Sequence, residues 1–168
     1  MATTPFEDVF QQLNQHHVRY LVVGGLAVVL HGHLRATADI DLVLALDREN
    51  VLAAIQALKS LDYRPRPPVP FEEFAESDKR SEWIQQKGLT VFSAYSDRFP
   101  GVEIDLFVSE PFQFDEAYTR SSRIAVDQTI ITVLGIDDLI QMKRGVGRPL
   151  DLSDVEALEA IQGAKESR

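Results

Sequence analysis

The sequence contains no cysteine in its 168 residues. That absence excludes disulfide bonds, iron–sulfur clusters, cysteine-ligated zinc sites and a cysteine nucleophile. Positive charge is also scarce, because 17 lysines and arginines stand against 26 aspartates and glutamates, for a net charge of −9. Such a chain does not present a broad basic surface to nucleic acid, and we expect it to bind phosphate groups through a metal ion or a small local cluster of cations.

Long apolar runs are absent as well. The longest, residues 20–30, is interrupted by Gly24 and Gly25 and is shorter than the ~20 residues that a bilayer span requires. Residues 1–10 contain Glu7 and Asp8 and lack the basic start of a signal peptide. We therefore expect no membrane segment and a cytoplasmic location. The length predicts a single domain over residues 1–168, and the composition, 45% hydrophobic and 26% charged, is that of a globular protein.

Apolar spacing and turn residues predict helices and strands in a mixed order. Helices are expected at residues 6–13, directly after 24–25, and at 48–61, 136–144 and 153–161, with Asp47 and Ser153 as caps of the third and last. Strands are expected at residues 19–23 and 38–46 and in two hairpins, one joining 89–95 to 102–108 and one around 127–128. This order indicates an α+β (α/β) fold, with a mixed, mostly antiparallel sheet and helices packed on one side.

Asp39 and Asp41 are the first candidate site. One residue apart on a strand, their side chains share a face with α-carbons ~6.6 Å apart, so both can reach a common pair of divalent cations. A solvated strand end is the simpler interpretation of an isolated pair. However, the strand continues as an apolar run over residues 42–46, where adjacent carboxylates repel unless a cation neutralises them. Asp105 would add a third carboxylate if its strand pairs beside this one.

A family resemblance rests on these residues. Gly24-Gly25, then thirteen residues, then Asp39-Ile40-Asp41 and a later Asp105 resemble the signature of the DNA polymerase beta superfamily of nucleotidyltransferases. Residues 35–41 and 143–154 resemble more narrowly its small bacterial members, which include abortive-infection toxins. The resemblance implies that Asp39, Asp41 and Asp105 are catalytic and hold two Mg²⁺ ions. It further implies nucleoside triphosphate binding by Gly24, Gly25, Arg35 and Lys143.

The implied reaction transfers a nucleoside monophosphate from the triphosphate to an acceptor hydroxyl, on RNA, a protein or a small molecule, and releases pyrophosphate. A toxin of a toxin–antitoxin pair would work in this way. An antibiotic-modifying enzyme of the lincosamide or aminoglycoside type is an alternative, and so is a catalytically silent nucleotide-binding or partner-binding protein on the same fold. Because one small domain leaves little protein to hold an acceptor, an antitoxin or a second copy of the chain is an expected partner.

Three residues near the end of the sequence have two interpretations each. Lys143 is either a cation for the triphosphate or part of a solvated helix end. Asp151 and Asp154 flank an expected helix start, where capping and compensation of the helix dipole are the simpler roles. In the second interpretation, one of the two aspartates supports Lys143 or acts as a base toward the acceptor.

Overall fold

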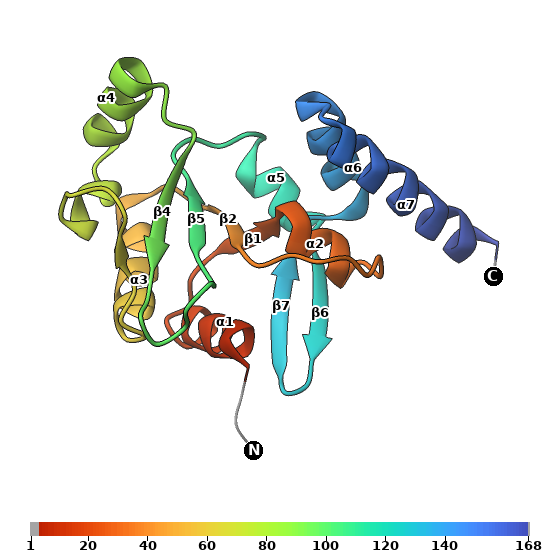
Figure 1. Ribbon diagram of the computed structural model, residues 1–168, viewed down its shortest axis with the longest axis horizontal. Coiled ribbons are helices and arrows are strands. Elements are labelled where there is room, and N and C mark those ends of the chain that lie inside the picture. Colours follow the sequence, from red (N-terminus) through yellow and green to blue (C-terminus); the bar gives the residue numbers. More distant parts are fainter. Residues whose placement is uncertain (1–3, 168) are drawn as a thin grey trace.

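A seven-stranded sheet lies at the centre of the computed structural model, which describes residues 4–167 (Figure 1). The strands are β1 (Tyr20–Val23), β2 (Ile40–Leu44), β3 (Arg64–Pro65), β4 (Val91–Tyr95), β5 (Ile104–Phe107), β6 (Ser122–Val126) and β7 (Thr129–Val133). Their order across the sheet is β3-β4-β5-β2-β1-β7-β6. β1 with β7 and β2 with β5 pair in parallel, whereas the other neighbours are antiparallel. The predicted mixed, mostly antiparallel sheet is confirmed, including both hairpins.

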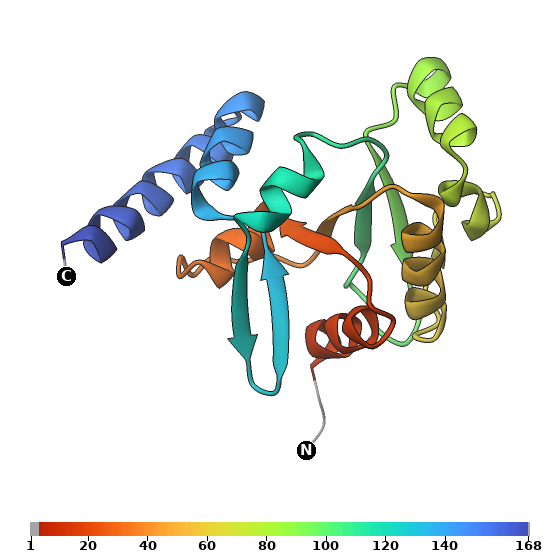
Figure 2. The same cartoon turned by 180° about the vertical axis from the view of Figure 1, so that it is seen from behind.

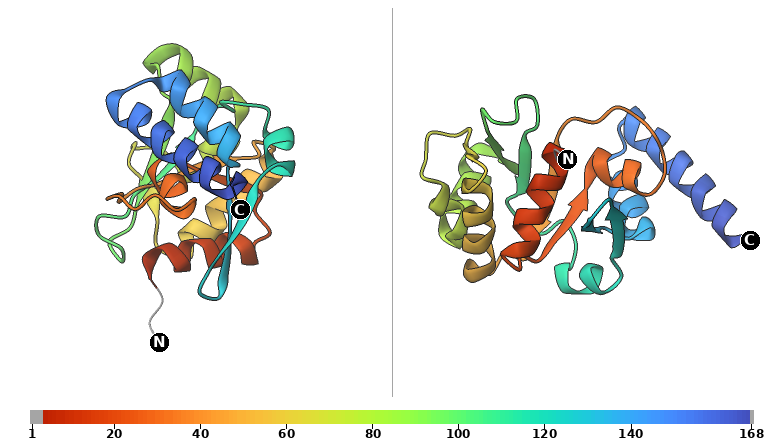
Figure 3. Two further views of the ribbon diagram at one scale, coloured as in Figure 1. Left: turned by 90° about the vertical axis from the view of Figure 1, so that its right-hand side faces the viewer. Right: turned by 90° about the horizontal axis from the view of Figure 1, so that it is seen from below.

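The helices are α1 (Pro5–Gln15), α2 (Gly24–Leu30), α3 (Arg48–Lys59), the 3-10 helix η1 (Phe71–Ala75), α4 (Ser77–Lys87), α5 (Phe114–Thr119), α6 (Ile136–Val146) and α7 (Pro149–Glu166). Helices α1 and α3 contact each other and lie in front of the sheet in Figure 2. The C-terminal half of α7 extends away from the sheet (Figure 3). Within residues 4–167, none of the helices combines the length and the apolar character needed to cross a membrane.

Local hydrogen bonds explain where several helices begin. Thr4 and Glu7 form a capping box at α1, and Asp47 accepts a hydrogen bond of 3.0 Å from the Asn50 N–H at the start of α3. The predicted start of the last helix at Ser153 is wrong, because α7 begins at Pro149. Proline fits the first turn of a helix, and Asp151 accepts a hydrogen bond from the Arg148 N–H there, so the helix gains a turn before Ser153.

An aromatic cluster packs against β4, near one edge of the sheet. The ring of Phe92 lies 6.0 Å from that of Phe71, 5.2 Å from that of Phe74 and 5.2 Å from that of Trp83. These rings come from η1 and α4, so the cluster joins the two helices to β4. The neighbouring residue on β4, Ser93, points to the opposite face of the sheet, and its position therefore depends on this packing.

We predict that Phe92→Ala lowers the free energy of unfolding by about 3–5 kcal/mol, because it removes a fully buried ring and leaves a cavity. Urea denaturation followed by circular dichroism measures the change. Ile84→Ala is the control, since Ile84 is 37% exposed and its loss is expected to cost less than ~1 kcal/mol. Equal losses for the two variants would contradict the role of the cluster.

Candidate active site

Asp41 and Asp105 face each other across the parallel strands β2 and β5. The register pairs Ile40 with Ile104, Asp41 with Asp105 and Leu42 with Leu106. The four apolar side chains in these pairs are fully buried. Because side chains alternate along a strand, both aspartates point to the opposite face of the sheet. The condition stated for Asp105, a strand beside that of Asp41, is met.

The environment of Asp41 disfavours its negative charge. Burial, the charge of Asp105, a hydrogen bond with Asp105 and the charge of Asp39 together raise the pKa of Asp41 to about 7, against a smaller opposite effect of Lys143. Burial and the charges of Asp105 and Glu103 also raise the pKa of Asp39. The effects that raise these pKa values disfavour the negatively charged form of each aspartate. Asp41 and Asp105 are therefore side-by-side carboxylates that a divalent cation would stabilise.

Asp39 lines a different cavity from Asp41. It precedes β2 by one residue and is exposed. In residues 4–167, no group of three or more histidine, aspartate or glutamate side chains is arranged to hold a metal ion. The donor chemistry of Asp41 and Asp105 thus fits a hard cation, while a third ligand from Asp39 is not formed in this arrangement.

Gly24 brings the backbone directly against the carboxylate pair. Its φ angle is +68°, and a Cβ atom there would lie 2.1 Å from Asp41 Oδ2. The next residue, Gly25, is equally restricted, since its Cβ would lie 2.8 Å from both Arg35 Nη2 and Thr37 Oγ1. Side chains at either position would displace these groups, so close approach restricts both glycines, and the positive φ angle restricts Gly24 in addition.

Ser93 is a site residue that the sequence analysis missed. Its hydroxyl donates a hydrogen bond of 2.5 Å to Asp105 Oδ1, and the two residues are directly paired between β4 and β5. The bond fixes one carboxylate oxygen of Asp105. The sequence does show Ser93 as a polar residue within the predicted strand 89–95, on the face opposite Phe92. Only the register of the hairpin, however, places it beside Asp105.

Lys143 and Arg35 meet at one buried carboxylate. Lys143 Nζ lies 2.9 Å from Asp154 Oδ2 and 3.4 Å from Asp151 Oδ1. Arg35 donates to the same Asp154 through Nε, at 2.9 Å, and through Nη2, at 3.0 Å. Lys143 is buried, so the interpretation as a solvated helix end is wrong for it. Asp151 does cap α7, and the pair of aspartates also supports Lys143.

Asp151 remains a charged partner in this cluster. Burial raises its pKa, but the hydrogen bond from Arg148 and the positive charge of Lys143 outweigh that effect, and the pKa of Asp151 lies below its usual value. The distance from Arg148 Nε to Asp151 Oδ2 is 2.8 Å. Lys143 is thus placed by two aspartates of α7.

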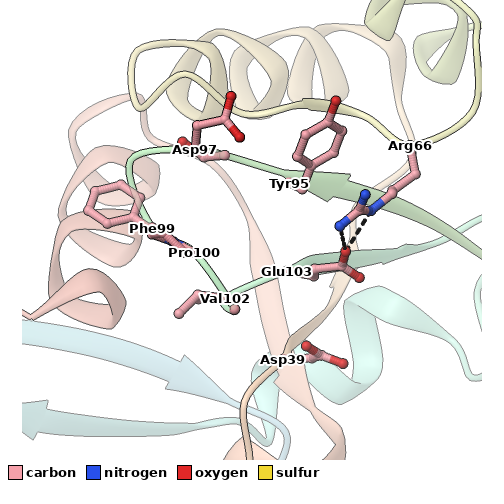
Figure 4. A pocket seen from close by; sticks show the side chains of 10 residues that line it. Asp39, Arg66, Tyr95, Asp97, Phe99, Pro100, Val102 and Glu103 are labelled. Carbon is pink, nitrogen blue, oxygen red and sulfur yellow. Dashed lines mark hydrogen bonds and ion pairs between the residues drawn. The ribbon is translucent and has the colours of Figure 1, made fainter.

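Two cavities lie on either side of the aspartates. One, of about 450 Å³, has Gly24, Asp41 and Lys143 at its polar end and a mainly apolar wall from β4, β5 and α6, formed by Val91, Phe107, Leu139, Met142 and Val146. The other, of about 350 Å³, lies between Asp39 and the β4–β5 hairpin (Figure 4). In Figure 4, Arg66 is joined to Glu103, and the Arg66 guanidinium lies 4.2 Å from the centre of the Tyr95 ring. Asp41 therefore lines a mainly apolar cavity, and Asp39 lines a more polar one.

A profile of a family described as nucleotidyltransferases of unknown function (DUF6036) matches residues 5–164. The chain belongs to this nucleotidyltransferase family. The predicted class of enzyme is thereby confirmed. No curated protein sequence matches the chain.

Solved structures share the fold of this nucleotidyltransferase at low sequence identity. The lincosamide antibiotic adenylyltransferase LnuA, with lincomycin bound, is 16% identical, with a TM-score of 0.60 over 96% of this chain and 99% of its own. ANT(2'')-Ia in complex with adenylyl-2''-tobramycin is 14% identical, with a TM-score of 0.58 over 97% and 95%. An antigenic nucleotidyltransferase-like protein from Paracoccidioides brasiliensis is 14% identical, with a TM-score of 0.52 over 92% and 76%.

Asp41→Asn is expected to stabilise the metal-free protein above neutral pH. The pKa of Asp41 in the folded state, about 7, is above its usual value of 3.8. Its contribution to stability is therefore full below pH ~4 and is lost as the pH rises through 7. At pH 8 we expect a gain of about 1–3 kcal/mol in the free energy of unfolding, since one pKa unit corresponds to ~1.4 kcal/mol, and almost none at pH 4.

Urea denaturation in EDTA at the two pH values measures this difference, with Asp97→Asn, an exposed aspartate, as the matched control. Addition of Mg²⁺ at pH 8 is expected to raise the stability of the wild type more than that of Asp41→Asn. A variant less stable than wild type at pH 8 without metal would disprove the repulsion between Asp41 and Asp105.

Proposed function

We propose that this nucleotidyltransferase transfers a nucleoside monophosphate from a nucleoside triphosphate to an acceptor hydroxyl at Asp41 and Asp105, releasing pyrophosphate. The observation that carries the proposal is the pairing of Asp41 with Asp105 on neighbouring strands, with the backbone of Gly24 directly beside Asp41. Phosphoryl transfer depends mainly on positioning and on compensation of charge, and a fixed carboxylate pair with bare backbone beside it suits both.

The nucleotide is proposed to occupy the larger cavity. Gly24 lines this cavity beside Asp41, with Gly25 next to it in the turn, and Lys143 supplies a positive charge at the same end. Arg35 adds charge behind Gly25, although its donors are bound to Asp154 and to the Ala36 carbonyl oxygen. The apolar wall suits the flat face of a base.

Mg²⁺ is the proposed cofactor, held by Asp41 and Asp105. The two-ion site expected from the sequence would also need Asp39, which does not group with them among residues 4–167. When bound, the ions would neutralise the carboxylates and polarise the phosphate under attack. The chain's own contribution is to hold the ligands in place. The sheet register fixes Asp41 opposite Asp105, and the Ser93 hydroxyl fixes the Asp105 carboxylate. Because the pKa of Asp41 is raised to about 7, a cation that binds there competes with a proton on Asp41 near neutral pH.

The acceptor is proposed to enter through the smaller cavity, beyond Asp39. Its wall includes Tyr95 and Phe99, and its volume, about 350 Å³, matches a small molecule or one end of a larger one. As the alternative function, we propose a small-molecule acceptor of the antibiotic type. The likeness to LnuA and ANT(2'')-Ia over nearly their whole chains supports this alternative. Three expectations stay predictions from the sequence. They are an RNA or protein acceptor, an antitoxin or a second copy of the chain as partner, and a cytoplasmic location.

Labelled nucleotide transfer tests the proposed function. Each α-labelled nucleoside triphosphate is incubated with Mg²⁺ and, separately, with cellular RNA, cellular protein, and a pool of aminoglycosides and lincosamides. We expect one acceptor fraction to be labelled by the wild type, and Asp41→Ala and Asp105→Asn to reduce the rate by about 100-fold or more. The labelled fraction identifies the acceptor class.

Asp115→Asn is the matched control, because this aspartate is 85% exposed and is paired with Arg19. It is expected to label at the wild-type rate. The proposed function is wrong if the wild type labels no fraction with any of the four nucleotides, or if Asp41→Ala labels as fast as wild type. The first of these results would favour a catalytically silent protein on the same fold.

A further inference from the structure

Asp154 is the most deeply buried charged residue beside the proposed nucleotide cavity. It is 0% exposed and accepts hydrogen bonds or ion pairs from three nitrogen atoms of two cations. Arg35 Nε and Nη2 lie at 2.9 and 3.0 Å, and Lys143 Nζ lies at 2.9 Å. Burying a carboxylate is costly unless it is fully paired, and here two cations share it.

A role in starting the helix does not account for this burial. Helix α7 begins at Pro149, so Asp154 is its sixth residue and lies beyond the first turn. Side chains that cap a helix or compensate its dipole act within that turn. Asp151, the third residue, is the one that accepts the hydrogen bond from the Arg148 N–H. The partners of Asp154 instead come from α6 and from the segment that leads to Asp39.

Both partners of Asp154 lie against the proposed site. Arg35 Nη2 would be 2.8 Å from a Cβ atom on Gly25, so the guanidinium packs directly behind the glycine turn. Lys143 lines the larger cavity together with Gly24 and Asp41. Asp154 therefore joins the turn on one side of the cavity to α6 on the other.

The charges of this cluster suit a phosphate ligand. Three cations, Arg35, Lys143 and Arg148, pair with two carboxylates, Asp151 and Asp154, so this group carries one positive charge when Asp41 is not counted. In a chain with a net charge of −9, this cluster next to the glycine turn is a small, local source of positive charge. Because the aspartates already hold the Lys143 ammonium group, less of its conformational freedom remains to be lost on binding.

We infer that Asp154 is a positioning residue for triphosphate binding, which holds Lys143 at the larger cavity and Arg35 behind Gly25. The inference rests on the proposed function. Asp154 lines neither cavity, and of its two partners only Lys143 does. Its removal should therefore weaken nucleotide binding mainly when Lys143 is present.

A double-mutant cycle tests this dependence. Calorimetry measures the dissociation constants of ATP, GTP, CTP, UTP and inorganic triphosphate for wild type, Asp154→Asn, Lys143→Met and the double variant. We expect each single variant to weaken binding of the preferred nucleotide about tenfold, and the double variant to bind within about twofold of Lys143→Met. Glu159→Gln, which removes an exposed ion pair with Arg144 between the same two helices, is expected to bind as wild type does.

Asp154→Glu covers the case in which Asp154→Asn fails to fold. It keeps the charge but moves the carboxylate by one methylene, and we expect a higher KM for the nucleotide with kcat little changed. Additive effects in the cycle, or nucleotide binding by Asp154→Glu equal to that of wild type, would overturn the inference while leaving the proposed function in place. Failure of the wild type to bind any nucleoside triphosphate would instead overturn the proposed function, and the inference with it.

Discussion

The repulsion between Asp41 and Asp105 is built into the sheet, because the register of β2 and β5 leaves neither side chain another direction to take. The apolar neighbours of each aspartate are fixed in the core, and a one-residue slip would bury the carboxylates and expose those neighbours. The surrounding structure is fitted to this pair. Gly24 has no side chain where one would strike Asp41, and Ser93 donates to Asp105. The core thus keeps together two groups that would separate if they were free.

Charge of opposite sign lies close to the glycine turn. Lys143 and Arg35 are held at Asp154, so a positive cluster lies close to the negative pair without neutralising it. Acidic and basic groups left free would pair directly with one another. Here the cations are held by α7, and the carboxylates are held by the sheet. A ligand that carries phosphate groups together with a divalent cation can then match both charges at once.

Local patterns in the sequence were enough to predict most elements and one half of the site. Helical spacing after Pro5, the cap at Asp47 and the alternation around Asp105 each depend on near neighbours, and the structure agrees with them. The start of α7 was misjudged because Ser153 offers a good cap, whereas Pro149 and Asp151 together offer a better one. The contact between Arg35 and Asp154 joins residues that are 119 positions apart in the sequence. The spacing of apolar residues along a helix or strand contains no information about such a contact.

The parallel pairing of β2 with β5 also constrains how the chain folds. Between these strands the chain forms α3, β3, η1, α4 and β4. The two ends of this long connection must come together, at a cost in chain entropy, before the strand pairing can lower the free energy. Hairpins such as β6–β7 need only a short turn and form on a microsecond scale, whereas long-range parallel pairing is intrinsically slow. The contact that creates the carboxylate pair is therefore expected late in folding, after the apolar residues that oppose its repulsion have already begun to pack.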